Sequence, residues 1–265
     1  YRSCKWLHGD KMHRAWLLMC ALTGNTGREG GGMQTTQLSR GDGFAKFVFA
    51  GVGPRLKVAA ISVWDYARGD GKALNAKTYG NEVADHFEKH YRESINNGWL
   101  PDYSKTPWKM AIMAGHNTAN WRAAGTRFRK TVLAKLETIV TMTPDMSVTA
   151  MYSDYVLPVA QHYERRDFVQ EGRTPYVQVL DQAVPPLGES ADDWTIMERL
   201  AKSISAKARA RQLPPIKDVV FGQPITHDYA RLHELFTLNG KITNSRDLAQ
   251  FLLDNSAGIP KVTFE

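Results

Sequence analysis

Cysteine is scarce in this sequence, which has only Cys4 and Cys20 among its 265 residues. Two thiols exclude a scaffold held by several disulfides, and they exclude a metal site with four thiolate ligands from this chain alone. Long hydrophobic runs are also missing, since the longest strongly apolar stretch, residues 15–22, is far too short to cross a bilayer. We therefore expect a soluble chain without a transmembrane segment.

The motifs of two common enzyme classes are absent as well. A serine hydrolase of one large class holds its nucleophile in a Gly-x-Ser-x-Gly turn, and the sequence contains none. Gly51 and Gly53 lack the third glycine of the dinucleotide fingerprint, and no Gly-Lys-Ser or Gly-Lys-Thr completes a P-loop. The sequence therefore disfavours serine hydrolysis and P-loop nucleotide hydrolysis.

Charge of one sign is not concentrated in any long run. The 34 lysines and arginines exceed the 27 aspartates and glutamates by seven, and the two signs are interspersed. This mild positive bias is compatible with anionic ligands but is weak support for nucleic acid, so we expect no nucleic-acid partner. Apolar residues at 43% and charged residues at 23% are ordinary globular values, which excludes disorder as the main state.

Helical and strand periodicities alternate along the chain, as is typical of an α/β domain. Residues 109–114 and 138–142 are predicted to be strands with a helix over 125–136 between them, and this unit favours a parallel sheet. We expect a Rossmann-like, mostly parallel sheet flanked by helices. Other expected elements are a helix over 11–22 capped by Asp10, a helix over 81–95, a strand at 155–157, an extended stretch over 176–184, a helix capped by Ser190, and short helices over 228–236 and 246–253.

Three of these helices carry an apolar stripe at helical spacing, which we expect to be buried; that of the helix capped by Ser190 consists of Trp194, Met197, Ala201 and Ile204. Trp16 and Met19 belong to the stripe of the first helix, and Val83, Phe87 and Tyr91 form that of the helix over 81–95. Cys20 lies on the first stripe as well. A zinc site is therefore disfavoured, and we expect no metal bound solely by this chain; the candidate ligands for such a site are Cys4, His8, His13 and Cys20.

A glycine-rich loop follows the first predicted helix, with five glycines in the nine positions from Gly24 to Gly32. Glycine permits positive φ and close approach of the backbone to a ligand, which suits a large phosphorylated cofactor. A flexible surface connection is the alternative interpretation.

A second candidate segment, Gly115-His116-Asn117, follows the carboxyl end of the predicted strand over 109–114. Open α/β sheets bind ligands at that edge, and the amides of Asn117 and Asn120 can donate and accept, as needed to contact a base or pterin. The alternative is that these asparagines only form the turn and cap the next helix.

Two further segments carry polar groups. Lys5 and His8 precede the first helix, where a lysine could offer a cation or proton donor and a histidine could shuttle protons; a solvated basic end is the alternative. Ser153 and Asp154 precede the strand at 155–157. They are interpreted either as a polar turn that enters a buried strand or as part of a site.

The stretch Thr149-Ala-Met-Tyr-Ser-Asp-Tyr-Val-Leu-Pro158 and the later Pro185-Pro-Leu-Gly-Glu-Ser190 resemble the signature of molybdopterin oxidoreductases of the dimethyl sulfoxide reductase family. Upstream, residues 5–10 and 22–32 resemble the glycine-rich cofactor segment of that family, especially in the branch with nitrate, selenate and chlorate reductases and ethylbenzene-type dehydrogenases. The resemblance spans roughly residues 1–205, and the joint order of its motifs is specific.

This resemblance implies a cofactor and a set of contacts. In the family, molybdenum is held by two molybdopterin guanine dinucleotides between α/β domains of a larger enzyme. By resemblance, the pterin would border the glycine loop, the guanine dinucleotide would contact the segment after the first strand, and Ser153 and Asp154 would be structural or face the cofactor. Lys5 with His8 would lie on the substrate side. The residues that would border the pterin are Gly30, Gly31, Gly32 and Gln34, and those that would contact the guanine dinucleotide are Gly115, His116 and Asn117.

The resemblance also implies what this chain belongs to. We expect an internal fragment of a catalytic subunit, inactive alone, with a cofactor-binding α/β domain over 1–209 and a helical extension over 210–265 leading toward a missing C-terminal domain. The intact enzyme would carry out two-electron oxygen-atom transfer or hydroxylation on a small molecule, carry an iron–sulfur cluster outside this chain, and pass electrons to an iron–sulfur subunit in the periplasm. The alternative is a noncatalytic α/β module that binds an anionic ligand or nucleic acid.

Overall fold

The computed structural model describes residues 8–32, 46–47, 66–67, 69–105, 107–121, 124–170, 177–220, 223–257, 261 and 263. Within these ranges, no helix combines the length and the apolar composition that crossing a membrane requires.

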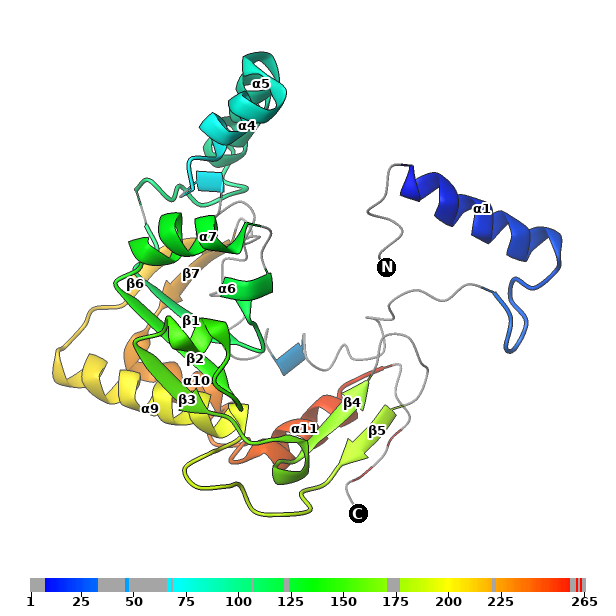
Figure 1. Ribbon diagram of the computed structural model, residues 1–265. Helices are drawn as coiled ribbons and strands as arrows, with labels where there is room; N and C mark the ends of the chain where they lie inside the picture. The colour runs from blue at the N-terminus through cyan, green and yellow to red at the C-terminus, as the bar shows by residue number, and fades with distance from the viewer. Residues whose placement is uncertain are drawn as a thin grey trace.

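A parallel sheet of three strands lies at the centre of the fold (Figure 1). β1 (Met110–Ala114), β2 (Thr138–Thr143) and β3 (Tyr155–Pro158) pair in that order, with Ala114 opposite Met142 and Leu157 opposite the same residue on the other side. β2 is the middle strand and its four central residues are buried, which explains its continuous run of apolar and β-branched residues. The predicted parallel unit is therefore confirmed.

The connection from β1 to β2 supplies much of the core. It contains α6 (Thr118–Trp121), α7 (Gly125–Thr131) and a 3₁₀ turn (Leu133–Lys135), and Phe128 of α7 packs with Met113 of β1 and Ile139 of β2. The predicted helix over 125–136 is thus too long, because α7 ends at Thr131 with Val132 as its C-cap and a separate 3₁₀ turn follows. The shorter α8 (Val148–Met151) connects β2 to β3.

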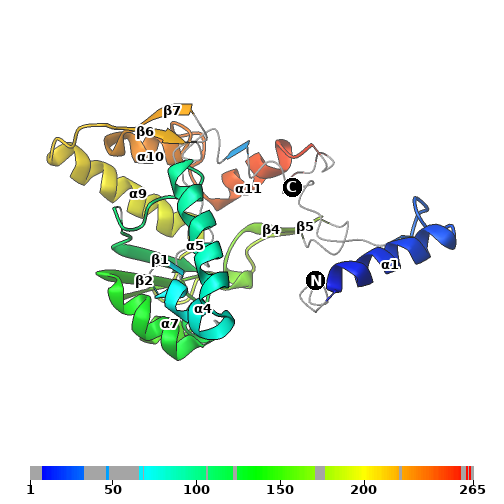
Figure 2. The ribbon, with the colours of Figure 1, turned by 90° about the horizontal axis from the view of Figure 1, so that it is seen from above.

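Two antiparallel helices, α4 (Gly71–Tyr79) and α5 (Asn81–Asn96), form a hairpin next to this core, as both views show (Figures 1 and 2). Tyr66 donates a hydrogen bond to the Glu88 carboxylate of α5 at 2.6 Å, and its burial together with this bond raises the pKa of the phenol. The predicted α5 is confirmed, but its stripe is only partly buried. Tyr91 is buried, whereas Val83 and Phe87 remain about half exposed because no described element covers them.

The first helix, α1 (Gly9–Leu22), lies apart from the other described elements in both views (Figures 1 and 2). Two expectations about it are wrong. The helix begins at Gly9 after His8, which has a left-handed φ of 57°, so Asp10 lies in the first turn instead of capping it. Its apolar stripe is exposed at Trp16 and Met19, because no described element packs against it.

The longest helix, α9 (Asp193–Ala210), follows the signature region. Asp192 caps it by accepting a hydrogen bond from the Thr195 N–H at 2.8 Å, so the predicted cap Ser190 is wrong; the Ser190 hydroxyl instead donates to the Leu187 carbonyl. Two antiparallel hairpins complete this part: β4 (Asp167–Gln170) pairs with β5 (Val177–Leu180), and β6 (Ile216–Val220) pairs with β7 (Gln223–His227). The periodicity predicts neither hairpin, although β5 lies within the predicted extended stretch over 176–184.

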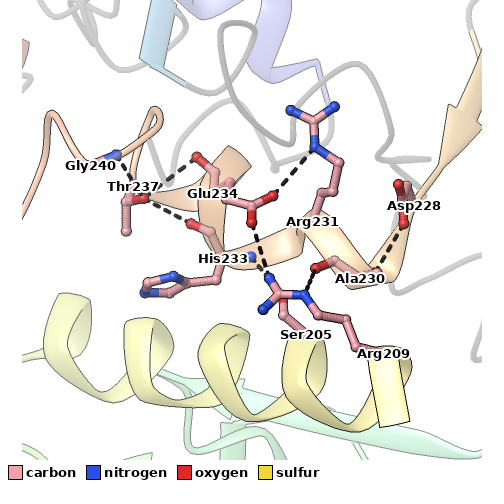
Figure 3. A network of polar contacts seen from close by, with 9 residues as sticks. All are labelled: Ser205, Arg209, Asp228, Ala230, Arg231, His233, Glu234, Thr237 and Gly240. Carbon is pink, nitrogen blue, oxygen red and sulfur yellow. Dashed lines mark hydrogen bonds and ion pairs between the residues drawn. The ribbon is translucent and has the colours of Figure 1, made fainter. Parts of the chain in front are cut away.

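The C-terminal segment packs against α9 through a 3₁₀ turn (Tyr229–Arg231) and α10 (Leu232–Phe236), while α11 (Ser245–Asp254) follows. The predicted helix over 228–236 therefore exists as these two pieces, and the one over 246–253 is confirmed. Figure 3 shows the polar contacts: the His233 N–H donates to Ser205 Oγ at 2.9 Å, and Arg209 donates to Glu234 at 3.0 Å. The extension is thus anchored to the preceding helix by named side chains.

Loss of the Ser205 hydroxyl is expected to loosen this anchor. Ser205 is buried, so Ser205→Ala leaves the His233 N–H without its acceptor, at a cost of about 1–3 kcal/mol. Amides of α10 should then exchange with deuterium about ten-fold faster in the polypeptide that contains this chain, with β1 and β2 unchanged. Ser203→Ala on the exposed side of α9 is the matched control. Equal exchange in the two variants would contradict the proposed anchor.

Candidate functional site

A pocket of about 430 Å³ opens at the carboxyl edge of the parallel sheet. Each strand contributes the loop that follows it: residues 115–117 after β1, 143–145 with the end of β2, and 159–162 after β3. Arg165 and Asp193 complete the wall. Ligands of open α/β sheets bind at this edge, which agrees with the expectation for the segment after β1.

The loop after β1 is held in a defined turn. Gly115 has a φ of 65°, which glycine adopts without strain, and the exposed ring of His116 contacts Trp121 with ring centroids 5.6 Å apart. Asn117 Oδ1 accepts hydrogen bonds from the backbone N–H and the hydroxyl of Thr149. The Asn117 Nδ2 has no partner among the described residues and can donate to a ligand.

The loop after β2 adds a carboxylate to the pocket. The Thr143 hydroxyl donates to Asp145 Oδ1 at 2.9 Å, which leaves the second carboxylate oxygen for a ligand. Ser147 also lines the pocket, and its hydroxyl accepts the Ala150 N–H at 3.2 Å as the cap of α8. This side of the pocket therefore offers acceptors to donor groups of a ligand.

The loop after β3 adds a cation. Arg165 donates to the Asp193 carboxylate at 2.6 Å and lies 3.6 Å from an Asp167 carboxylate oxygen. Its Nε atom is buried without a hydrogen-bond partner, which is unusual because buried donors are nearly always paired. Gln161 and His162 on the same loop are exposed to the pocket. Arg165 thus adds a positive charge to this wall and has one donor, Nε, without a partner among the described residues.

Ser153 and Asp154 lie at the amino end of β3, at the opposite edge of the sheet from the pocket. Asp154 Oδ2 accepts the Ile139 N–H at 2.7 Å, and the Asp154 N–H donates to the Ile139 carbonyl at 2.9 Å. The Ser153 hydroxyl donates to the Thr149 carbonyl and lies 2.6 Å from the Thr141 hydroxyl. These contacts support the structural interpretation of the pair, since they join β2 to the turn before β3.

The glycine loop does not contribute to the pocket at the sheet edge. Gly30 and Gly32 have φ values of 71° and 83°, and a Cβ at Gly31 would lie 2.5 Å from the Asn25 carbonyl oxygen, so the loop conformation itself requires glycine. His8 is exposed at the start of α1. Lys5 and Gln34 lie outside the described residues. Their proposed roles stay predictions.

Sequence reasoning overlooks most of the pocket wall. Asp145, Gln161 and Arg165 are not among the predicted site residues, although they follow the same rule as Asn117. Because parallel strands end at one edge, the residues after β2 and β3 belong beside those after β1. The rule applied to all three predicted strands, and not to the first alone, would have located these loops.

Comparison with known proteins places the chain in a family. Residues 3–203 match the family model described as molybdopterin oxidoreductase. The dimethylsulfide dehydrogenase alpha subunit of Rhodovulum sulfidophilum is 29% identical over 97% of this chain and 29% of the relative. The respiratory nitrate reductase alpha subunit of Haloferax mediterranei is 32% identical over 95% of this chain and 26% of the relative. The chlorate reductase alpha subunit of Ideonella dechloratans is 27% identical over 100% of this chain and 30% of the relative.

The chain therefore spans less than a third of the length of these relatives. Among solved structures, acetylene hydratase from Pelobacter acetylenicus aligns with this chain at 21% sequence identity and a TM-score of 0.40. The alignment covers 56% of this chain and 16% of the hydratase chain. The family model, in contrast, covers most of the chain, from near its first residue to the middle of α9. On that basis the chain belongs to the molybdopterin oxidoreductase family.

Proposed function

We propose that the polypeptide in which this chain occurs is the catalytic subunit of a molybdenum enzyme that performs two-electron oxygen-atom transfer or hydroxylation. The relatives named as reductases and a dehydrogenase support this class of reaction over a noncatalytic binding module. The observation that carries the proposal is the pocket at the carboxyl edge, where loops from all three strands converge. In this proposal the chain holds the cofactor and other parts of the polypeptide complete the active site.

The residues of the pocket fit a molybdopterin guanine dinucleotide. The unpaired Nε of Arg165 and the Asn117 amide nitrogen can donate to phosphate or carbonyl oxygens, and the free Asp145 oxygen can accept from guanine N–H groups. A volume of about 430 Å³ lies in the range typical of small-molecule and cofactor pockets. The pocket would therefore hold the dinucleotide end of the cofactor.

The bound cofactor would supply the redox chemistry through its metal, while this chain would bind and orient it. In the proposal, Gly30, Gly31 and Gly32 with Gln34 border the pterin, and Lys5 with His8 lies on the substrate side. An iron–sulfur cluster outside this chain and an iron–sulfur partner subunit would carry the electrons. The periplasm is the proposed location.

Arg165→Met tests the cofactor site. It keeps the apolar stem but removes the guanidinium, and a hydrogen bond to a charged group is typically worth about 1.5–3 kcal/mol. The polypeptide in which this chain occurs should then retain about ten-fold less molybdenum and acid-released GMP after gel filtration. Metal analysis and chromatography of the released nucleotide provide the two measurements.

Arg166→Met is the matched control for this experiment. Arg166 is the neighbouring arginine, forms an ion pair with Asp181 at 2.9 Å and does not line the pocket at the sheet edge. Its variant should retain the wild-type content of both components. A wild-type polypeptide that contains neither molybdenum nor a pterin would refute the proposed function, and equal losses in both variants would refute the assigned role of Arg165.

A further inference from the structure

The orientation of the Asn117 amide is determined by its partner. The Thr149 backbone N–H lies 3.2 Å from one atom of the Asn117 side chain, and a backbone N–H can only donate. That atom must therefore be the acceptor Oδ1, whichever way the amide would otherwise be assigned. The Thr149 hydroxyl donates to the same oxygen at 3.0 Å. Two hydrogen bonds thus engage the oxygen with Thr149, and the NH₂ group is the part of this pocket-lining side chain that has no partner among the described residues.

Thr149 is itself held in place. Its exposed fraction is 0%, and its hydroxyl accepts the Ala119 N–H at 3.0 Å while donating to Asn117. Donor and acceptor capacities of the hydroxyl are both used, across a sequence separation of about thirty residues on either contact. The side chain therefore joins the start of α8 to the loop after β1 and to α6.

We propose that Thr149 is a positioning residue that makes Asn117 a pure hydrogen-bond donor toward the pocket. The ligand atom at this position would then be an acceptor oxygen, as a phosphate or a guanine carbonyl carries. This inference rests on the proposed function for the identity of the ligand, but the polarity of the amide follows from the contacts alone. Thr149 contacts no ligand and acts only through Asn117.

The role of the hydroxyl can be separated from the role of the side-chain volume. Valine has nearly the same shape as threonine but lacks the hydroxyl, so Thr149→Val removes one bond to Asn117 and leaves the Ala119 N–H without its acceptor. Thr149→Ser keeps the hydroxyl and loses one methyl group. Thr141→Val is the matched control, because Thr141 is equally buried and its hydroxyl contacts Ser153 and no pocket residue.

The experiment measures cofactor release from the purified polypeptide in which this chain occurs. Molybdenum and acid-released GMP are followed over time after transfer to cofactor-free buffer. Thr149→Val is expected to release both about ten-fold faster than the wild type, whereas Thr149→Ser and Thr141→Val should stay within about two-fold. Deuterium exchange in β2 reports whether the sheet is intact in each variant.

The possible outcomes distinguish the two proposals. Equal release from Thr149→Val and Thr141→Val would overturn the positioning role, and so would failure of Thr149→Ser to restore retention. A wild-type polypeptide without cofactor would overturn the proposed function and, with it, the assigned ligand of Asn117. If Thr149→Val does not accumulate as folded protein, Asn117→Asp decides instead, since it keeps an acceptor for Thr149 and removes the NH₂ group; undiminished retention in that variant would overturn the proposal.

Discussion

Replacing Asn117 with aspartate is expected to remove most of the bound cofactor without disturbing the fold. The carboxylate can still accept the Thr149 N–H and hydroxyl, so the contact between the loop after β1 and α8 is preserved. The atom that faces the pocket, however, changes from a donor to a negatively charged acceptor. Repulsion between this carboxylate oxygen and an acceptor oxygen of the ligand should weaken the binding free energy by several kcal/mol. That corresponds to a loss of affinity of at least about a hundred-fold.

Asn120→Asp provides the control for this experiment. It adds the same charge three residues away, on an exposed residue of α6 that does not line the pocket. Molybdenum and acid-released GMP per polypeptide are the measurements, and Asn120→Asp should match the wild type. Comparable loss in both variants would mean that general charge matters and not the amide of Asn117. Retention by Asn117→Asp would show that no acceptor oxygen lies opposite this residue.

Truncation of Phe128 is expected to have the largest effect on stability. Its ring is 1% exposed and packs between β1, β2 and the start of the 3₁₀ turn. Removing a fully buried aromatic ring costs about 3–5 kcal/mol, because the lost contacts and the remaining cavity both destabilise the folded state. Phe128→Ala should therefore raise deuterium exchange in β1 and β2 by about a hundred-fold or more.

Phe87→Ala is the comparison for this variant. Phe87 lies on α5 and is about half exposed, so truncation removes less buried surface and leaves no enclosed cavity. Exchange in β1 and β2 should stay close to that of the wild type. If Phe128→Ala behaved like Phe87→Ala, the cluster around Phe128 would not be the core that supports the sheet.

The parallel sheet was accessible to sequence reasoning because its middle strand, β2, is buried on both faces. β2 appears as a continuous apolar and β-branched run, and Gly115 ends the run before it in the expected place. The hairpin of β6 and β7 was not accessible. Ile216 and Val219 in β6 are more than half exposed, so burial imposes no alternating pattern on this strand.

Burial of the α1 stripe could not be inferred for a different reason. Helical spacing of apolar residues identifies the face that seeks a partner, but it does not say whether the partner lies in the same chain. Trp16 and Met19 lie on that face and remain exposed here. Likewise, the caps Asp192 and Ser190 are equally suitable by residue type, and only the geometry of the preceding turn selects between them.

One wall of the candidate site could be predicted from the sequence, and the opposing wall could not. Gly115, His116 and Asn117 could be placed because an end-of-strand rule and a resemblance pointed to the same segment. The opposing wall depends on Arg165, whose position follows from a turn after β3 and an ion pair with Asp193 on a distant helix. Such a contact has no local signal in the sequence, since it requires the register of the sheet and the direction of α9 together.

The short connections within the sheet have a kinetic consequence. Val140 pairs with Tyr155, only fifteen positions later, and Met110 pairs with Thr138 across a single compact connection. Closing loops of this length costs less chain entropy than closing longer ones, so these pairings can form before contacts between residues farther apart in the chain. During synthesis from the amino end, the three strands and their following loops can assemble before α9 and the C-terminal segment emerge. Arg165 would then acquire its partner Asp193 last, which closes the wall of the pocket only after the sheet has formed.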